Sequence, residues 1–278
     1  MQKELDKLLL LLRSTDEANV RLGLQLAANY PAEIKAHFGY APQDMQDLFE
    51  MLMAYEALPV DTPFLEMEQL DLSDKDLVVL SPAIRLLQNL THLYLSGNQF
   101  QHLPAEIVGL QSLTNIVLMR NQLQSLPVEI GALQKLTHLI LFDNQLQSLP
   151  TEITALQKLT FFNLENNQLQ SFPTEIIALQ NLGYLYLNDN SIEYLPAEIG
   201  GLQNLVRLNL GDNQLKSLPV EIGALQKLSF LDLRGNQLQS LPVEIGALQN
   251  LTHLDLRNNS LASIPEEVRS LPNLTIYA

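Results

Sequence analysis

The stretch LTHLILFDNQLQSLPTEITALQK, residues 136–158, recurs with the same 23-residue period from about Met67 to the end of the chain. The asparagine of the unit returns at Asn98, Asn121, Asn144, Asn167, Asn190, Asn213, Asn236 and Asn259. The proline returns at Pro104, Pro127, Pro150, Pro173, Pro196, Pro219, Pro242 and Pro265. Each unit reads Leu-x-x-Leu-x-Leu-x-x-Asn-x-Leu-x-x-Leu-Pro-x-Glu-Ile-x-x-Leu-x-x, and random enrichment in leucine would not keep both residues in phase.

The pattern inside one unit predicts a short strand followed by a short helical turn. Leu139 and Leu141 alternate with Ile140, as in a strand with one buried face. The amide of Asn144 can both donate to and accept from backbone groups, so a stacked column of asparagines would satisfy the turn that leaves each strand. Residues 150–156 place proline at a first helical position and glutamate in the first turn, which predicts an α or 3₁₀ turn on the outer side.

This spacing resembles the leucine-rich repeat family, whose units are about 20–29 residues long. The resemblance covers roughly three quarters of the chain. It implies an α/β solenoid, a right-handed horseshoe with a parallel sheet on its concave side, and a general role in holding a protein or peptide. One unit buries too little apolar surface to offset the entropy of ordering its backbone, so neighbouring units must stabilise each other in one cooperative stack.

Domain organisation follows from the limits of the repeat. Residues 67–278 form the predicted solenoid, with a degenerate unit at 67–89, eight full units at 90–273 and a partial strand at 274–278. Residues 1–66 show helical spacing instead, with a fourth segment running from about Pro42 to Leu58. We interpret them as a helical cap that covers the open end of the first unit, since that edge has to be covered; a separate helical interaction domain is the alternative.

Composition excludes several classes of function. The net charge of −15, without a visible basic stripe, argues against nucleic-acid binding. No cysteine is present, so disulfides, thiolate nucleophiles and thiolate metal sites are excluded. The apolar run at residues 8–12 is too short for a signal peptide or a membrane span. We therefore expect a monomeric cytoplasmic protein without a membrane partner, and leave open export by a route that reads no N-terminal signal.

Catalytic and metal-binding motifs are weak. The chain has no glycine-rich phosphate loop. His92 and His138 fall in one exposed column but are separated by an intervening strand, which is too far for shared metal ligation, so we expect no metal and no cofactor. Asp232 and Asp255 occupy the same exposed position of adjacent strands, where one pKa could rise and support acid–base chemistry. Nearby arginines offer counter-charges, so we favour a structural role for this pair.

The residues at positions three, five and seven of each unit should share the concave face. They predict a binding site in the first half of that face, made of Tyr94, Val117, Met119, Ile140, Phe142, Phe161, Tyr184 and Tyr186. In the second half, the charges predicted to orient a partner are Arg207, Asp232, Arg234, Asp255 and Arg257. The aromatic content of the first group matches the composition of interface hot spots. We predict a non-catalytic module that binds an unidentified protein or peptide; a self-associating scaffold and an enzyme using Asp232 and Asp255 are the alternatives.

Overall fold

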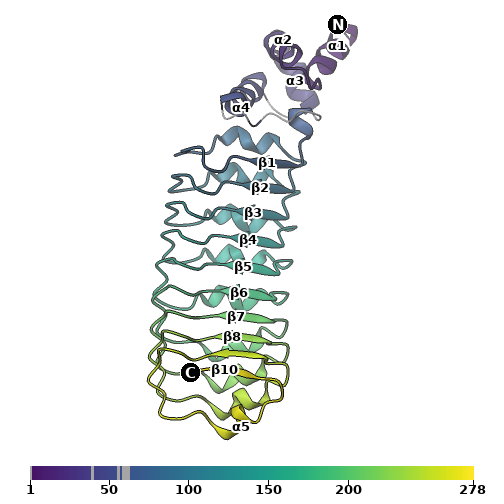
Figure 1. Cartoon of the computed structure of the whole chain (residues 1–278). Helices are drawn as coiled ribbons and strands as arrows, with labels where there is room; N and C mark the ends of the chain where they lie inside the picture. The colour runs from purple at the N-terminus through teal and green to yellow at the C-terminus, as the bar shows by residue number, and fades with distance from the viewer. Residues whose placement is uncertain (1, 39–40, 55–56, 58–62) are drawn as a thin grey trace.

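A computed structural model of the chain describes residues 2–38, 41–54, 57 and 63–278. Its N-terminal part consists of four helices, and the remainder is a stack of repeats (Figure 1). The helices are α1 (Gln2–Leu12), α2 (Glu17–Ala27), α3 (Pro31–Phe38) and α4 (Pro42–Ala54). The predicted end of the fourth segment, at Leu58, lies outside the described residues.

The repeats form one parallel sheet in which the strands follow their order in the sequence. The strands are β1 (Gln69–Asp71), β2 (His92–Tyr94), β3 (Asn115–Val117), β4 (His138–Ile140), β5 (Phe161–Asn163), β6 (Tyr184–Tyr186), β7 (Arg207–Asn209), β8 (Phe230–Asp232), β9 (His253–Asp255) and β10 (Thr275–Tyr277). Equivalent residues pair throughout, for example Leu139 with Phe162. The central residue of each strand from β1 to β9 is buried, because alternation turns it into the stack.

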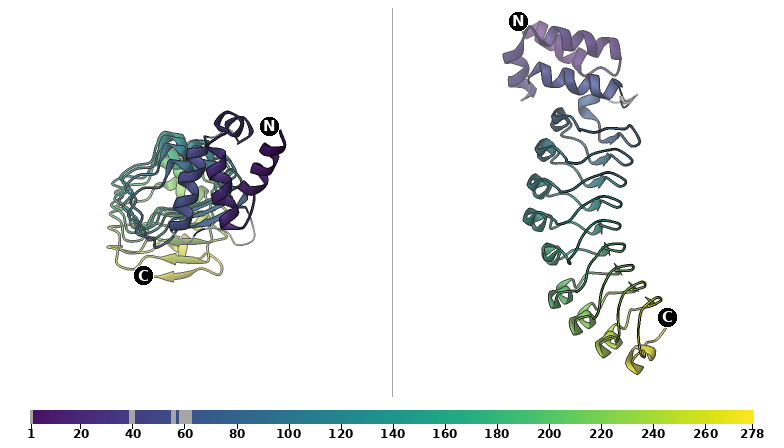
Figure 2. Two further views of the ribbon diagram at one scale, coloured as in Figure 1. Left: turned by 90° about the horizontal axis from the view of Figure 1, so that it is seen from above. Right: turned by 90° about the vertical axis from the view of Figure 1, so that its left-hand side faces the viewer.

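Short turns cover the opposite side of the stack, and the strands lie on the concave side (Figure 2). Eight are 3₁₀ turns: η2 (Pro82–Leu86), η3 (Ala105–Gly109), η4 (Val128–Ala132), η5 (Thr151–Ala155), η6 (Thr174–Ala178), η7 (Ala197–Gly201), η8 (Val220–Ala224) and η9 (Val243–Ala247). The last repeat has the α-helix α5 (Glu266–Arg269) instead. The repeated proline lies one residue before each turn from η3 on, not at the first helical position that we predicted. Its carbonyl accepts the first hydrogen bond, as from Ile153 N–H to Pro150 at 3.1 Å.

Glycine allows some of the successive turns to pack closely. A Cβ atom at Gly131 would lie 2.3 Å from the carbonyl oxygen of Glu152 in the next turn, and one at Gly223 would lie 2.4 Å from that of Glu244. The equivalent residue in η6 is Ile177, and there the next turn packs less closely. Glycine at this position therefore allows a close approach of the next turn, but Arg85 at the same position of η2 is followed by an equally close turn, so this residue alone does not determine the spacing.

The asparagine column points inward and is bonded to the backbone, as predicted; its members are buried except Asn190 and Asn259, which are half-buried. The Asn144 side-chain amide donates to the carbonyls of Leu118 (2.9 Å) and Leu141 (3.0 Å), and its oxygen accepts from Leu123 N–H (3.0 Å). Each asparagine thus ties its own turn to the preceding repeat. Asn98 does the same for the degenerate first unit, where it accepts from Leu77 N–H at 2.9 Å.

The helices pack on the first repeat. The Phe49 ring of α4 meets Phe64 of the 3₁₀ turn η1 (Phe64–Glu66) edge-on, with centroids 5.5 Å apart. Asp44 of α4 forms a 2.8 Å ion pair with Arg85 of η2. Buried side chains of helices and repeats belong to one continuous core. The helices thus cover the N-terminal end of the stack; the division into two units at residue 66 stays a prediction.

Candidate functional site on the concave face

The predicted partner-binding residues lie together on the concave side of β2 to β6. Tyr184 is 43% exposed. The remaining residues of this group, Tyr94, Val117, Met119, Ile140, Phe142, Phe161 and Tyr186, are half-buried. Met119 and Phe142 follow the ends of β3 and β4, and backbone hydrogen bonds still join their repeats, as from Arg120 N–H to the Phe142 carbonyl at 2.9 Å. These side chains therefore stand on consecutive repeats that are held together by backbone hydrogen bonds.

Phe161 is the centre of the aromatic contacts in this region. Its ring stacks on His138 at 5.6 Å and makes tilted contacts with Tyr184 at 5.9 Å and Tyr186 at 5.4 Å. Tyr94 lies further away and stacks on His92 at 6.2 Å. We call Phe161, Tyr184 and Tyr186 the aromatic cluster. Their packing against one another reduces the side-chain entropy that binding would otherwise cost.

A second aromatic group, which the sequence analysis missed, lies in the half of the face that we described as charged. The Phe230 and His253 rings are parallel, with centroids 4.3 Å apart, and Tyr277 lies 4.8 Å from His253. The Arg207 guanidinium lies over the Phe230 ring at 4.2 Å, a cation–π distance. The sequence could have predicted this group, because Arg207, Phe230 and His253 occupy position three of consecutive units. Our prediction for this half of the face rested mainly on the charged residues at positions five and seven.

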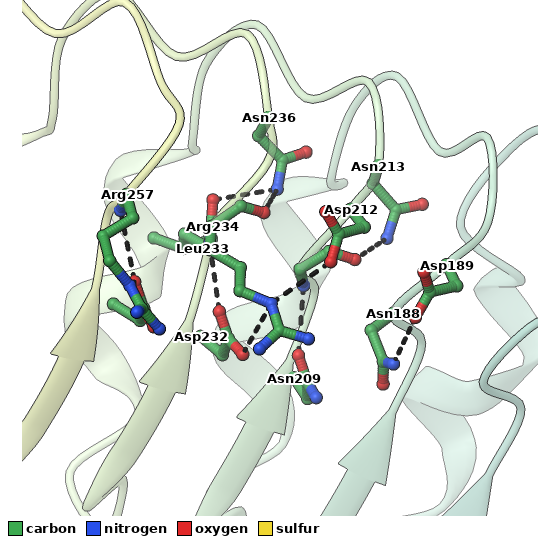
Figure 3. Close-up of polar contacts among 12 residues, drawn as sticks. Asn188, Asp189, Asn209, Asp212, Asn213, Asp232, Leu233, Arg234, Asn236 and Arg257 are labelled. Atoms are coloured by element: carbon green, nitrogen blue, oxygen red, sulfur yellow. Dashed lines mark hydrogen bonds and ion pairs between the residues drawn. The ribbon is translucent and has the colours of Figure 1, made fainter. Parts of the chain in front are cut away.

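The prediction that Asp232 and Asp255 are exposed is wrong. They pair across β8 and β9 as expected, but they are only 4% and 3% exposed. Each carboxylate folds back to accept the backbone N–H two residues ahead, from Arg234 at 3.0 Å and from Arg257 at 3.1 Å (Figure 3). Asn209 does the same with Gly211 N–H at 3.0 Å. Position five in these strands therefore caps its own turn, which draws the side chain out of solvent.

The electrostatics of the two aspartates differ. Burial raises the pKa of Asp232, against the opposing hydrogen bond from the Arg234 N–H and the charge of that arginine. Burial acts on Asp255 in the same direction, but hydrogen bonds from the side chain and backbone of Arg257, together with its charge, outweigh it and lower the pKa. Asp255 is bound by the Arg257 guanidinium, whereas Arg234 lies closer to Asp212, at 3.1 Å, than to Asp232, at 3.8 Å.

Two further properties bear on what the site can do. Among the described residues, no group of three or more histidine, aspartate or glutamate side chains is placed to hold a metal ion. In the same part of the chain, no helix is long and apolar enough to cross a membrane.

Comparison with known proteins identifies the family. The family described as "Leucine rich repeat" matches residues 66–123, 111–169, 180–238 and 226–276. The chain belongs to the leucine-rich repeat family. None of the curated proteins compared with it matches significantly.

Two solved receptor structures share the fold. The plant peptide hormone receptor RGFR1, in complex with RGF2, is 33% identical with a TM-score of 0.69, over 77% of this chain and 36% of the receptor chain. A TDR receptor is 31% identical with a TM-score of 0.62, over 76% of this chain and 34% of its own. A leucine-rich repeat protein of Leptospira interrogans is 30% identical, over 72% of this chain and 81% of its own, with a TM-score of 0.34. This chain therefore spans about a third of the length of the two receptors.

Proposed function

We propose that this leucine-rich repeat protein is a non-catalytic interaction module that binds a protein or peptide on its concave face. The observation that carries the proposal is the aromatic cluster around Phe161, which stands on a ten-stranded sheet at the middle of the stack. Aromatic side chains that are already packed present a large contact area at low entropic cost, which is the property of interface anchors. The complex of the receptor RGFR1 with RGF2 lends support by similarity of fold.

The charged residues of the second half would orient the partner. Arg207 is committed to Phe230, Arg234 to Asp212, and Arg257 to Asp255. Such paired charges at the edge of an interface change association rate and salt dependence more than they change affinity.

The test is a pull-down from native lysate with quantification of the bound proteins. The Phe161→Asp, Tyr184→Asp double variant should lose the partner that wild type retains, because two carboxylates would interrupt the aromatic cluster. A Val128→Asp, Val220→Asp double variant is the matched control, since those valines are 52% and 51% exposed in turns on the other side of the stack. A partner retained by the first variant and lost by the control would contradict the proposal.

The two alternatives are weaker. A self-associating scaffold would form oligomers at micromolar concentration, which gel filtration with light scattering measures directly. An enzyme using Asp232 and Asp255 would need one carboxyl group to reach a substrate. Both carboxylates instead hold the backbone of their own turns, and Asp255 is also bound by Arg257, so this arrangement favours the structural role.

A further inference from the structure

Next to the aromatic cluster, one buried hydrogen-bond acceptor has no donor in the part of the chain that the structure describes. Asn188 is 2% exposed, and its side-chain oxygen has no hydrogen-bond partner within the described residues. Its amide nitrogen donates to the Asp189 carboxylate at 2.8 Å, which fixes the orientation of the amide (Figure 3). Rotating the amide would bring two oxygens together, so the free oxygen is a consequence of this hydrogen bond. A buried polar atom without a partner is rare in proteins and calls for a donor.

The neighbour of Asn188 in the same column is a carboxylate that has no partner among the described residues. Glu165 occupies position seven of the preceding unit, and the two repeats are joined there by a hydrogen bond of 3.0 Å from Asn166 N–H to the Asn188 carbonyl. In the part of the chain that the structure describes, the half-buried Glu165 side chain makes no hydrogen bond and no ion pair. Among the described residues, two acceptors without a donor, one of them charged, therefore lie in adjacent repeats, two residues after the ends of β5 and β6.

The arginines of the second half of the concave face do not supply the missing charge, because each of them has another partner. Arg207 lies over the Phe230 ring. Arg234 is bound by Asp212, and its stem lies against the next residue of the column, Gly211, where a Cβ atom would be 3.1 Å from Arg234 Cγ. Arg257 is bound by Asp255. Glu165 and Asp189 thus leave a local excess of negative charge beside the unpaired oxygen.

We propose that Glu165, Asn188 and Asp189 form a subsite for a lysine or arginine side chain of the partner. This inference rests on the proposed function and adds to it the chemistry of one partner residue. An ammonium or guanidinium group supplies several donors at once, so it satisfies the Asn188 oxygen and neutralises Glu165 together. Tyr186 precedes Asn188 by two residues on β6, so the aliphatic stem of the same side chain would lie along the aromatic cluster. The partner segment would therefore pair an apolar residue with a nearby basic one.

The experiment selects random peptides displayed on phage against the full chain. Wild type should enrich lysine or arginine at a fixed distance from an apolar residue, and the Glu165→Lys variant should enrich acidic residues in that place instead. A synthetic peptide from the wild-type selection should bind Glu165→Gln about fivefold more weakly, with a smaller salt dependence. Asn188→Ala should weaken it in the same direction. Glu129→Gln, the same change on the outer turn η4, should leave its affinity unchanged.

The outcomes separate the two proposals. Peptides that require Phe161 but show no preference for basic residues would overturn the subsite and leave the proposed function standing. A library that yields no peptide dependent on Phe161 would overturn both. The melting temperatures of the Glu165 variants, measured in parallel, should match wild type, which assigns any loss of affinity to the site rather than to the fold.

Discussion

Replacing Asn167 by alanine tests how the asparagine column stabilises the stack. The Asn167 amide donates to the carbonyls of Leu141, Leu164 and Glu165 at 3.0–3.1 Å, and its oxygen accepts from Leu146 N–H at 3.0 Å. Each carbonyl has a second donor: Asn144 for Leu141, Asn190 for Leu164 and the Asp143 N–H for Glu165. The Leu146 N–H has no other partner in the described structure, so it alone becomes fully unpaired.

The expected cost is therefore that of one buried unpaired donor, about 1–3 kcal/mol in the free energy of unfolding. Asn259→Ala should cost less, because Asn259 is half-buried near the end of the stack and water can reach the groups that it leaves. Urea unfolding followed by circular dichroism measures both values. Gln168→Ala, at the exposed neighbouring position, is the control and should stay within about 0.5 kcal/mol of wild type. Equal losses at Asn167 and Asn259 would mean that the column is not a cooperative ladder.

Four further changes test other parts of the structure. Deleting residues 1–66 should expose the edge of the first repeat and cause aggregation or a large loss of melting temperature; a soluble truncation of equal stability would instead identify an independent N-terminal domain. Because the pKa of Asp232 is raised, its charged form destabilises the fold, and the free energy of unfolding should fall as pH rises through that pKa. Asp232→Asn should remove this loss and leave the free energy of unfolding at neutral pH unchanged or higher. The pKa of Asp255 is lowered, so its contribution to stability is present above the unfolded-state pKa and is lost as pH falls. Asp255→Asn should cost about 0.5–1.5 kcal/mol in the free energy of unfolding at neutral pH, measured by urea unfolding. An unchanged value would contradict the role of its hydrogen bonds. Gly131→Val should cost about 1–3 kcal/mol, since its side chain would enter the next turn, and an unchanged denaturation midpoint would contradict that packing.

The fold could be predicted because the same residues recur at the same spacing in every repeat. The invariant spacing of leucine, asparagine and proline determines the strand, the turn and the inward asparagine in every unit, and a parallel stack is the arrangement that brings equivalent residues together. The aromatic residues of the concave face could be placed for the same reason. Their role in binding stays a prediction, because the sequence carries no information on the partner.

The structure differs from the predictions at polar side chains that can either face solvent or form hydrogen bonds within their own turn. Period-two alternation places Asp232 and Asp255 on the exposed face. Each side chain instead bends to accept a hydrogen bond from a nearby backbone N–H, and alternation alone does not predict such bonds. The unpaired oxygen of Asn188 depends on its bond to Asp189, a contact within one turn that only the geometry shows. The stack of Phe230 on His253 could have been found by reading position three down the whole chain.

The central claim is that binding takes place on the concave face through the aromatic cluster. The most direct measurement is the affinity of the captured partner for wild type and for Phe161→Ala, by isothermal titration. We predict a loss of at least about 1 kcal/mol in binding free energy, with little change in the free energy of unfolding. Unchanged affinity for Phe161→Ala, together with loss of binding on changes within residues 1–66, would contradict the account and move the function to the helices.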